Sequence, residues 1–324
     1  MPATAAPTIR DLPIGGQAVL EGVMMRAPHA WAVAVRLPDT HPTNPGGISV
    51  TTEPLRPLHR RHRALRLPII RGAVALVESM GIGVRALGLS AAAAVADDPG
   101  GTDDPHGGAP GRLAWALTVA AGLAFAVSLF FLLPATITKL TLGDRLEHGV
   151  SFVAAEKLIR LTIFLGYLTL ISRFSHLQRL FQYHAAEHQT IACLEAGEPL
   201  TPHHAAHYSR LHPRCGTSFM FLVMIVSFLV FAPLGNLPLG WLLLSRIAGV
   251  PLVAGLTFEL IKWIGRHRDQ RFARALRWPG MQLQRLTTRP CDAPQLEVAI
   301  AALVAATAHG ELASDADLPF DLAA

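Results

Sequence analysis

Two histidines in the segment FQYHAAEHQTIACLEAG, residues 181–197, have the spacing of metal ligands on a helix. The segment is rich in helix-forming residues and ends at Gly197, the residue type expected just past a helix C-terminus. His184 and His188 are four positions apart, so on a helix their imidazoles lie one above the other. Glu187 completes an H-x-x-E-H order, in which two histidines hold zinc and the glutamate activates water. We therefore predict a divalent metal site, with zinc as the leading candidate and Glu187 as general base.

The segment LHPRCGTSF, residues 211–219, supplies candidates for a third ligand just before an apolar stretch. His212 and Cys215 are three positions apart, and a cysteine at a helix N-terminus beside Arg214 is favoured as the thiolate that binds metals. We expect His212 or Cys215 to join the two histidines. We expect Arg214 to stabilise developing oxyanion charge or to bind an anionic headgroup. The alternative is a loop histidine and a small buried cysteine without a metal.

Several other acidic residues are candidates for the site or its surroundings. Glu195 shares the stripe of His188, but it lies about 10 Å further along the helix axis and is too far away to bind the same ion. Glu259 and Glu156 fall inside apolar segments, where a charge is costly and is by default functional or paired. Glu21 is either a carboxylate at the end of a hairpin or a site residue.

The composition indicates that a bilayer surrounds much of this chain. Of its 324 residues, 51% are hydrophobic and 16% are charged, whereas a soluble domain carries about 25% charge. Four apolar segments have close to the ~20 residues that a bilayer core requires. We therefore expect a mainly α polytopic membrane protein with about four transmembrane helices, over residues 113–133, 152–172, 217–237 and 240–264.

Basic residues are concentrated in three regions, residues 1–67, the 173–214 loop and the tail after 264. The positive-inside rule then places both termini and this loop in the cytoplasm, which predicts a multi-pass protein of the bacterial inner membrane. We assign the net charge of +5 to contact with the anionic headgroups of the lipid bilayer and not to nucleic acid. A homo-oligomer is compatible with these features.

The remaining chain divides into modules around a membrane domain over residues 112–264. Residues 1–67 read as a water-facing β-rich module, in which the runs 30–37 and 47–55 form a hairpin. In residues 68–95, Arg71, Glu78 and Arg85 recur every seven residues, which predicts an amphipathic helix in the membrane plane. The alternative is a re-entrant or spanning helix. Residues 96–111 read as a flexible linker. Residues 265–324 contain a basic amphipathic helix over 266–286 and a second helix over 292–308.

Five motifs, in this order, resemble the YqhQ-like bacterial membrane family, a domain-of-unknown-function family (DUF1385) that is commonly labelled a predicted metal-dependent enzyme. The motifs are IGGQAVLEGVMMR, RGAVALVESMGIGVRAL, FQYHAAEHQTIACLEAGE, LHPRCGTSF, and LQRLTTRP followed by QLEVAIAAL. The resemblance covers roughly residues 10–308. It implies a multi-span membrane protein with a metal site and supplies no substrate. Carried over by position, it implies functional roles for Glu21, Glu78, His184, Glu187, His188, Glu195, His212, Arg214 and Cys215.

Four functions are compatible with these residues. The first is a metal-dependent hydrolase that acts on a membrane-proximal peptide or lipid at the cytoplasmic face. The second is a non-catalytic assembly factor or sensor with a closed, structural metal site. The third is an ion or proton transporter that uses Glu156 and Glu259, and the fourth is a thiol enzyme that uses Cys215 with a histidine base.

Overall fold

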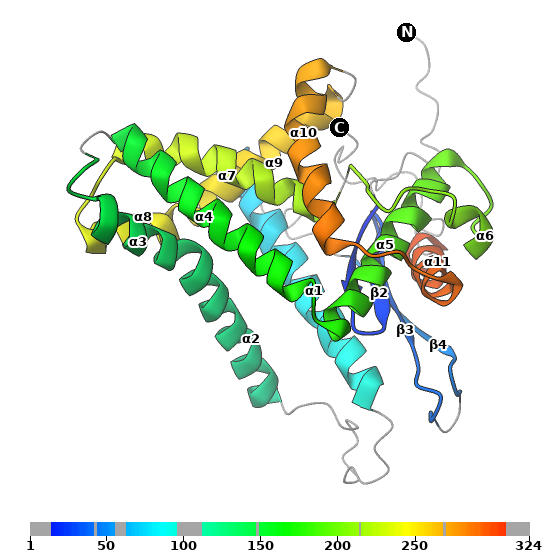
Figure 1. Cartoon of the computed structure of the whole chain (residues 1–324). Helices are drawn as coiled ribbons and strands as arrows, with labels where there is room; N and C mark the ends of the chain where they lie inside the picture. Colours follow the sequence, from blue (N-terminus) through cyan, green and yellow to red (C-terminus); the bar gives the residue numbers. More distant parts are fainter. Residues whose placement is uncertain are drawn as a thin grey trace.

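The computed structural model describes residues 14–41, 44–55, 63–95, 112–146, 149–213, 215–267 and 270–308. This part of the chain is mainly helical, as expected, with one small antiparallel sheet. Figure 1 shows two regions: a bundle of long helices, and a sheet that lies against α5 and α11 at one end of that bundle. The predicted linker 96–111 and Arg214 lie outside the described residues.

The sheet is a four-stranded antiparallel meander in the order β1-β2-β3-β4. Its strands are β1 Gly15–Val19, β2 Gly22–Arg26, β3 Ala30–Arg36 and β4 Ile48–Pro54. The predicted hairpin is confirmed as β3 and β4, which pair from Ala30 opposite Pro54 to Arg36 opposite Ile48. Strands β1 and β2 form a second hairpin with Glu21 at its end, which was one of the two alternatives for this residue, so the module is larger than a single hairpin. A two-residue turn joins them, and Glu21 in this turn has a φ of 51°.

The helices fall into two groups. The bundle contains α1 Ile70–Val95, α2 Arg112–Val127, α3 Leu133–Leu142, α4 Gly149–Ile171, α7 Gly216–Phe231, α8 Leu239–Ala248 and α9 Val250–Arg266. The helices at its sheet end are α5 Ser175–Ala196, α6 Pro202–Ala205, α10 Arg271–Thr287 and α11 Ala293–Ala308. Short segments complete the described elements, the 3-10 turns η3 Arg63–Arg66 and η5 Ala232–Leu234 and a π-helical turn, η4 Ser128–Leu132, that joins α2 to α3.

By length and composition, two helical stretches can cross a membrane, and up to four can if each of two bent pairs is one span. The two are Ile70–Ala93 and Leu113–Leu142, and the bent pairs are α4 with α5 and α8 with α9. The predicted span 217–237 is instead the shorter helix α7, because Pro233 and Gly235 interrupt it. The predicted span 240–264 is bent by 44° between α8 and α9, next to Pro251.

Helix α1 connects the bundle to the sheet. At its start, the Arg71 guanidinium forms an ion pair with Glu259 of α9. Further along, Ile82 and Ala86 are buried against the sheet face that carries Met24 and Trp31. We expected this segment to lie in the membrane plane, and the structure shows a helix long and apolar enough to cross a membrane. Its later turns, however, pack on the sheet.

The opposite face of the sheet packs on α5 and α11. Val23 and Met25 contribute to this core together with Ala186 of α5 and Leu303 of α11, while Met24, between them in β2, points to the α1 side. This alternation follows from the two-residue period of a strand. Because α5 packs on β1, β2 and α11, it is fixed against the sheet.

The turn between α4 and α5 directs α5 out of the bundle and across the sheet. The two helices are bent by 100° relative to each other. Helix α5 ends as predicted at Gly197, which has a φ of 75°, and its N–H donates to the carbonyl of Leu194. The predicted metal-binding segment is therefore one rigid helix between the sheet and the end of the bundle (Figure 1).

Candidate metal site

The structure brings together three of the four predicted metal ligands. His184 and His188 lie one turn apart on α5, with their ring centroids 4.4 Å apart. Cys215 lies just before α7, and its Sγ is 3.2 Å from Nε2 of His184. One potential ligand atom from each of the three residues lies within 4.8 Å of the other two. Helix periodicity accounts for the histidine pair, and the packing of residues 206–213 brings the cysteine to it.

Backbone carbonyls orient both imidazoles toward this group. Nδ1 of His184 is 2.8 Å from the carbonyl oxygen of Thr287, and Nδ1 of His188 is 2.6 Å from that of Arg210. A carbonyl oxygen can only accept, so in each ring Nδ1 carries the proton and donates it. The neutral ring then has its lone pair on Nε2, the tautomer that second-shell hydrogen bonds impose on metal-binding histidines.

The Nε2 atom of His188 is buried and has no hydrogen-bond partner among the described residues. The whole side chain is 1% exposed. An acceptor buried in this way costs free energy unless something pairs with it. His184 and Cys215 are only partly buried, so the group has a buried end at His188 and an open end.

The loop that carries Cys215 is held by Gln284 of α10. The backbone N–H of His212 donates to Oε1 of Gln284, and the Gln284 amide donates to the carbonyl of His212, both at 2.8 Å. Gln284 is fully buried. Together with Thr287 it makes the end of α10 part of the site, which the sequence analysis did not predict. The motif LQRLTTRP, which contains both residues, was the signal that could have identified them.

The fourth predicted ligand, His212, lies beside the group and not in it. Its ring centroid is 5.8 Å from that of His188, and its Nε2 is 3.3 Å from Oε1 of Glu195. We expected Glu195 to be too far along α5 to join the same ion as His188. In the structure Glu195 is outside the group of three ligands, and its carboxylate lies against His212.

Glu187 lies on the side of α5 that faces the sheet. Its carboxylate accepts a hydrogen bond from the backbone N–H of Gly16 in β1. A Cβ atom at Gly16 would lie 2.8 Å from Cδ of Glu187, so this approach requires glycine. Burial raises the pKa of Glu187, while His184, His212 and the Gly16 N–H oppose the rise without cancelling it. The carboxyl group therefore holds its proton to a higher pH than an exposed glutamate does.

The other predicted acidic residues form ion pairs away from the three ligands. Glu21 accepts a hydrogen bond from Nε of Arg179 at 2.5 Å, which fastens the β1–β2 turn to α5. Glu78 lies 3.3 Å from Nη2 of Arg26 in β2. Glu259 accepts a hydrogen bond from Nε of Arg71 at 2.6 Å. These three contacts join elements that are distant in the sequence.

Comparison with known proteins confirms the family resemblance that the sequence motifs indicated. The family profile described as "Protein of unknown function (DUF1385)" matches residues 67–309. The chain is 31% identical over 291 residues to "Uncharacterized protein YqhQ" of Bacillus subtilis (strain 168), an alignment that covers 88% of this chain and 89% of that protein. No solved structure matches. On these two findings, the chain belongs to the DUF1385 family.

Proposed function

We propose that this chain is a metal-dependent membrane hydrolase that acts on a membrane-proximal peptide or lipid. The observation that carries the proposal is the group formed by His184, His188 and Cys215, with the buried Nε2 of His188 unpartnered among the described residues. Two imidazole nitrogens and one sulfur suit zinc, and three protein ligands leave one position of a tetrahedral ion open. The partly exposed side of the group gives a substrate access to that position.

Each side chain near the group has a distinct role in this proposal. When bound, a zinc-like ion supplies a Lewis acid that polarises a substrate oxygen and makes water easier to deprotonate. Glu187 accepts the proton from water at its carboxylate and returns it to the leaving group. Gln284 and the carbonyl of Thr287 hold the ligand-bearing loop and the His184 ring in place. Arg214, between His212 and Cys215 in the chain, stabilises negative charge on the substrate.

The proposed location follows from the elements around the group. Helix α5 turns away from α4 at the end of the bundle, and α10 follows α9 at the same end. The basic residues of the 173–214 loop and of the tail favour the cytoplasmic face of the inner membrane for this end, by the positive-inside rule. A substrate at the headgroup level of the bilayer would then meet the open side of the group.

The experiment that tests the catalytic proposal compares Glu187→Gln with the wild type in detergent. The matched control is Glu198→Gln, which changes an exposed glutamate just past the end of α5. Zinc content and hydrolysis are measured for each protein, with a panel of fluorogenic peptides and a panel of phospholipids. We expect Glu187→Gln to keep its zinc and to lose hydrolysis by roughly 10²- to 10⁴-fold, because only the proton transfer is removed. The control variant should behave as the wild type.

Two results would contradict this assignment. Loss of zinc from Glu187→Gln would make Glu187 part of the metal-binding structure and not the base. Full zinc occupancy in the wild type without hydrolysis of either panel would favour the sensor or assembly factor. In that case cobalt substitution should show a closed four-ligand site that His212, 5.8 Å from His188 by ring centroids, has joined.

A further inference from the structure

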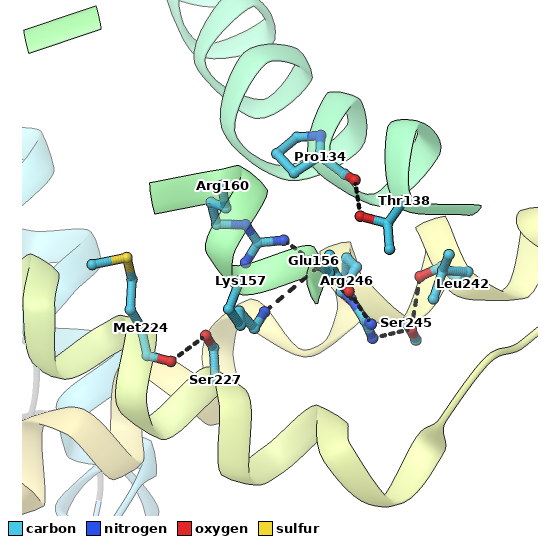
Figure 2. A network of polar contacts seen from close by, with 10 residues as sticks. All are labelled: Pro134, Thr138, Glu156, Lys157, Arg160, Met224, Ser227, Leu242, Ser245 and Arg246. Carbon is cyan, nitrogen blue, oxygen red and sulfur yellow. Dashed lines mark hydrogen bonds and ion pairs between the residues drawn. The ribbon is translucent and has the colours of Figure 1, made fainter. Parts of the chain in front are cut away.

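A second polar cluster lies inside the bundle, at the end of α4 away from α5. Its centre is the carboxylate of Glu156 in α4, which is completely buried. Lys157 and Arg160 from the same helix and Arg246 from α8 surround this carboxylate (Figure 2). Glu156 lies seven residues into α4, about 10 Å from its start. The three potential metal ligands, on α5 and just before α7, lie beyond the opposite end of α4.

Glu156 is shared by three basic side chains. The Arg160 guanidinium donates to Oε1 of Glu156 at 2.6 Å, and Nε of Arg246 is 3.0 Å from both carboxylate oxygens. The Lys157 ammonium lies 3.6 Å from Oε1. The exposed fractions of Lys157, Arg160 and Arg246 are 9%, 8% and 0%. The cluster therefore holds three positive charges against one negative charge among the described residues.

This imbalance persists whatever the protonation state of the lysine. An arginine keeps its charge in a protein, so Arg160 and Arg246 alone exceed the single carboxylate by one positive charge. Among the described residues, Lys157, Arg160 and Arg246 all form their ion pairs with Glu156, and none of the three pairs with a second acid. Uncompensated buried charge is strongly unfavourable, which is why buried charges are normally paired.

Aromatic rings stabilise the cations only in part. The Phe231 ring lies under both Lys157 and Arg246, with distances of 5.0 and 4.4 Å to the ring centroid, and Phe131 lies 5.2 Å from Arg160. Such contacts are weaker than pairing with a carboxylate or phosphate. Two donors remain without a hydrogen bond among the described residues, Nζ of Lys157 and Nε of Arg160, and both atoms are buried.

We infer that this cluster binds an oxyanion of the phosphate type, either a lipid phosphate group or free phosphate. A phosphate with up to two negative charges matches the excess of positive charge. Its oxygens accept hydrogen bonds from arginine forks and from a lysine ammonium. Glu156 orients Arg160 and Arg246, while the unbonded donors of Lys157 and Arg160 bind the anion. This inference does not depend on the proposed hydrolase activity, because no residue is shared with the metal site.

The test uses the purified full chain, delipidated in a zwitterionic detergent, and follows its thermal unfolding midpoint. One arm adds inorganic phosphate and a second adds phosphatidic acid in mixed micelles. The references are chloride at equal ionic strength for the first arm and phosphatidylcholine for the second. We expect a saturable rise of the midpoint in at least one arm, since a ligand that binds only the folded state raises it. A rise with phosphatidic acid alone identifies the lipid source, and a rise with inorganic phosphate identifies the free ion.

Three variants assign the response to the cluster. Arg160→Gln removes a donor and should weaken the apparent affinity for the phosphate probe roughly tenfold or more. Lys157→Glu supplies a second carboxylate in place of the anion. Its thermal unfolding midpoint should therefore lie near that of the wild type saturated with the phosphate probe, and the probe should no longer raise it. Lys139→Glu makes the same change of charge in α3, where the lysine bonds Asn236, and should keep the response.

Specific results would overturn the inference. One is that neither probe raises the wild-type midpoint above its reference. Another is that Lys157→Glu responds as strongly as the wild type. If Lys157→Glu does not fold, the test rests on Arg160→Gln. An affinity of this variant for the phosphate probe equal to that of the wild type would contradict the site.

Discussion

At the scale of single residues, the geometry of the candidate metal site depends on the hydrogen bonds that its two histidine rings donate through Nδ1. The carbonyls of Thr287 and Arg210 accept from the Nδ1 atoms, which leaves both Nε2 atoms as acceptors facing the same group. His184 Nε2 lies against the Cys215 thiol, and His188 Nε2 has no partner among the described residues. Side chains that were merely polar and surface-facing would not need both rings fixed in this way. The arrangement fits a site prepared for a ligand that binds nitrogen and sulfur.

A first prediction concerns the reactivity of the three cysteines. Burial raises the pKa of Cys193, and it raises that of Cys291 to about 11, so both thiols are protonated and unreactive near pH 7.5. We expect iodoacetamide to label Cys215 at that pH, and we expect added zinc to protect it. Labelling of Cys291 should increase only as the pH approaches 11, because the thiolate forms above its pKa. Peptide mass spectrometry of the labelled protein measures all three sites.

Two outcomes of the labelling experiment would oppose the site. Equal labelling of Cys291 and Cys215 near neutral pH would contradict the raised pKa of Cys291 and its contact with Gln189. Labelling of Cys215 that zinc does not slow would indicate that its sulfur is not a ligand.

A second prediction concerns Gln284, which positions the loop without touching the metal group. Gln284→Ala removes both hydrogen bonds to the backbone of His212, so Cys215 is held less firmly. Loss of such a supporting contact typically costs 10- to 100-fold in metal affinity. We expect this loss in zinc titrations of Gln284→Ala. The control Gln282→Ala changes the same residue type two positions earlier on α10 and should bind zinc as the wild type does. Equal affinities in both variants would remove Gln284 from the site.

The sequence predicts only part of the site at this scale. The pairing of His184 with His188 follows from helix periodicity, because residues four positions apart share a helix face, whereas Glu187 follows from the H-x-x-E-H order. The choice between Cys215 and His212 stayed open, since it depends on how residues 206–213 pack against α10. The supporting groups from Arg210 and Thr287 are backbone carbonyls. The type of a residue does not reveal the direction in which its backbone carbonyl points.

At the scale of elements, α5 is positioned by the sheet as much as by the bundle. Its buried residues pack on β2 and α11, and the Glu21–Arg179 contact fastens the β1–β2 turn to it. Strand β1 comes so close to α5 that Gly16 has no room for a side chain beside Glu187. The sheet thus sets the position of the carboxylate relative to the two histidines.

A third prediction tests this contact between β1 and α5. Gly16→Ala would place a Cβ 2.7 Å from the carbonyl oxygen of Met24 and 2.8 Å from Cδ of Glu187. Overpacking of this kind typically costs about 1–3 kcal/mol. The expected result is a lower thermal unfolding midpoint for Gly16→Ala. Gly15→Ala is the matched control, because a Cβ at Gly15 would meet nothing within 4 Å. A Gly16→Ala protein as stable as Gly15→Ala would show that β1 does not approach α5 so closely.

Hydropathy located most of the long helices but misjudged where some of them end. The predicted span 217–237 contains Pro233 and Gly235, and α7 ends at Phe231 before them. Strands β1 and β2 were predicted only as one alternative, a hairpin that ends at Glu21, because their residues do not alternate between apolar and polar. Both faces of β2 are buried, so Val23, Met24 and Met25 are all apolar, and Gly15–Gly16 resembles a turn. A search for alternating apolar and polar residues assumes that one face of the strand is exposed to solvent, so it cannot detect such strands.

At the scale of the whole molecule, α4 separates two polar centres with opposite chemical preferences. The metal group beyond one end offers nitrogen and sulfur ligands with lone pairs, and the cluster around Glu156 near the other end offers cations. The apolar composition predicted a membrane protein, and the long apolar helices support it. Composition could not show that Arg246, far along the chain in α8, joins Glu156, because that contact depends on how α8 and α4 pack.

Zinc content is the most direct test of whether His184, His188 and Cys215 bind a metal. The chain is purified after growth with zinc, and bound metal is measured by elemental analysis for the wild type, His188→Ala and Cys215→Ser. The control is the double variant His203→Ala and His207→Ala, which removes another adjacent histidine pair, exposed near α6. We expect about one zinc per chain in the wild type and the control, and a large loss in the other two variants. Equal zinc content in all four proteins, or none in the wild type even after zinc is added, would contradict it.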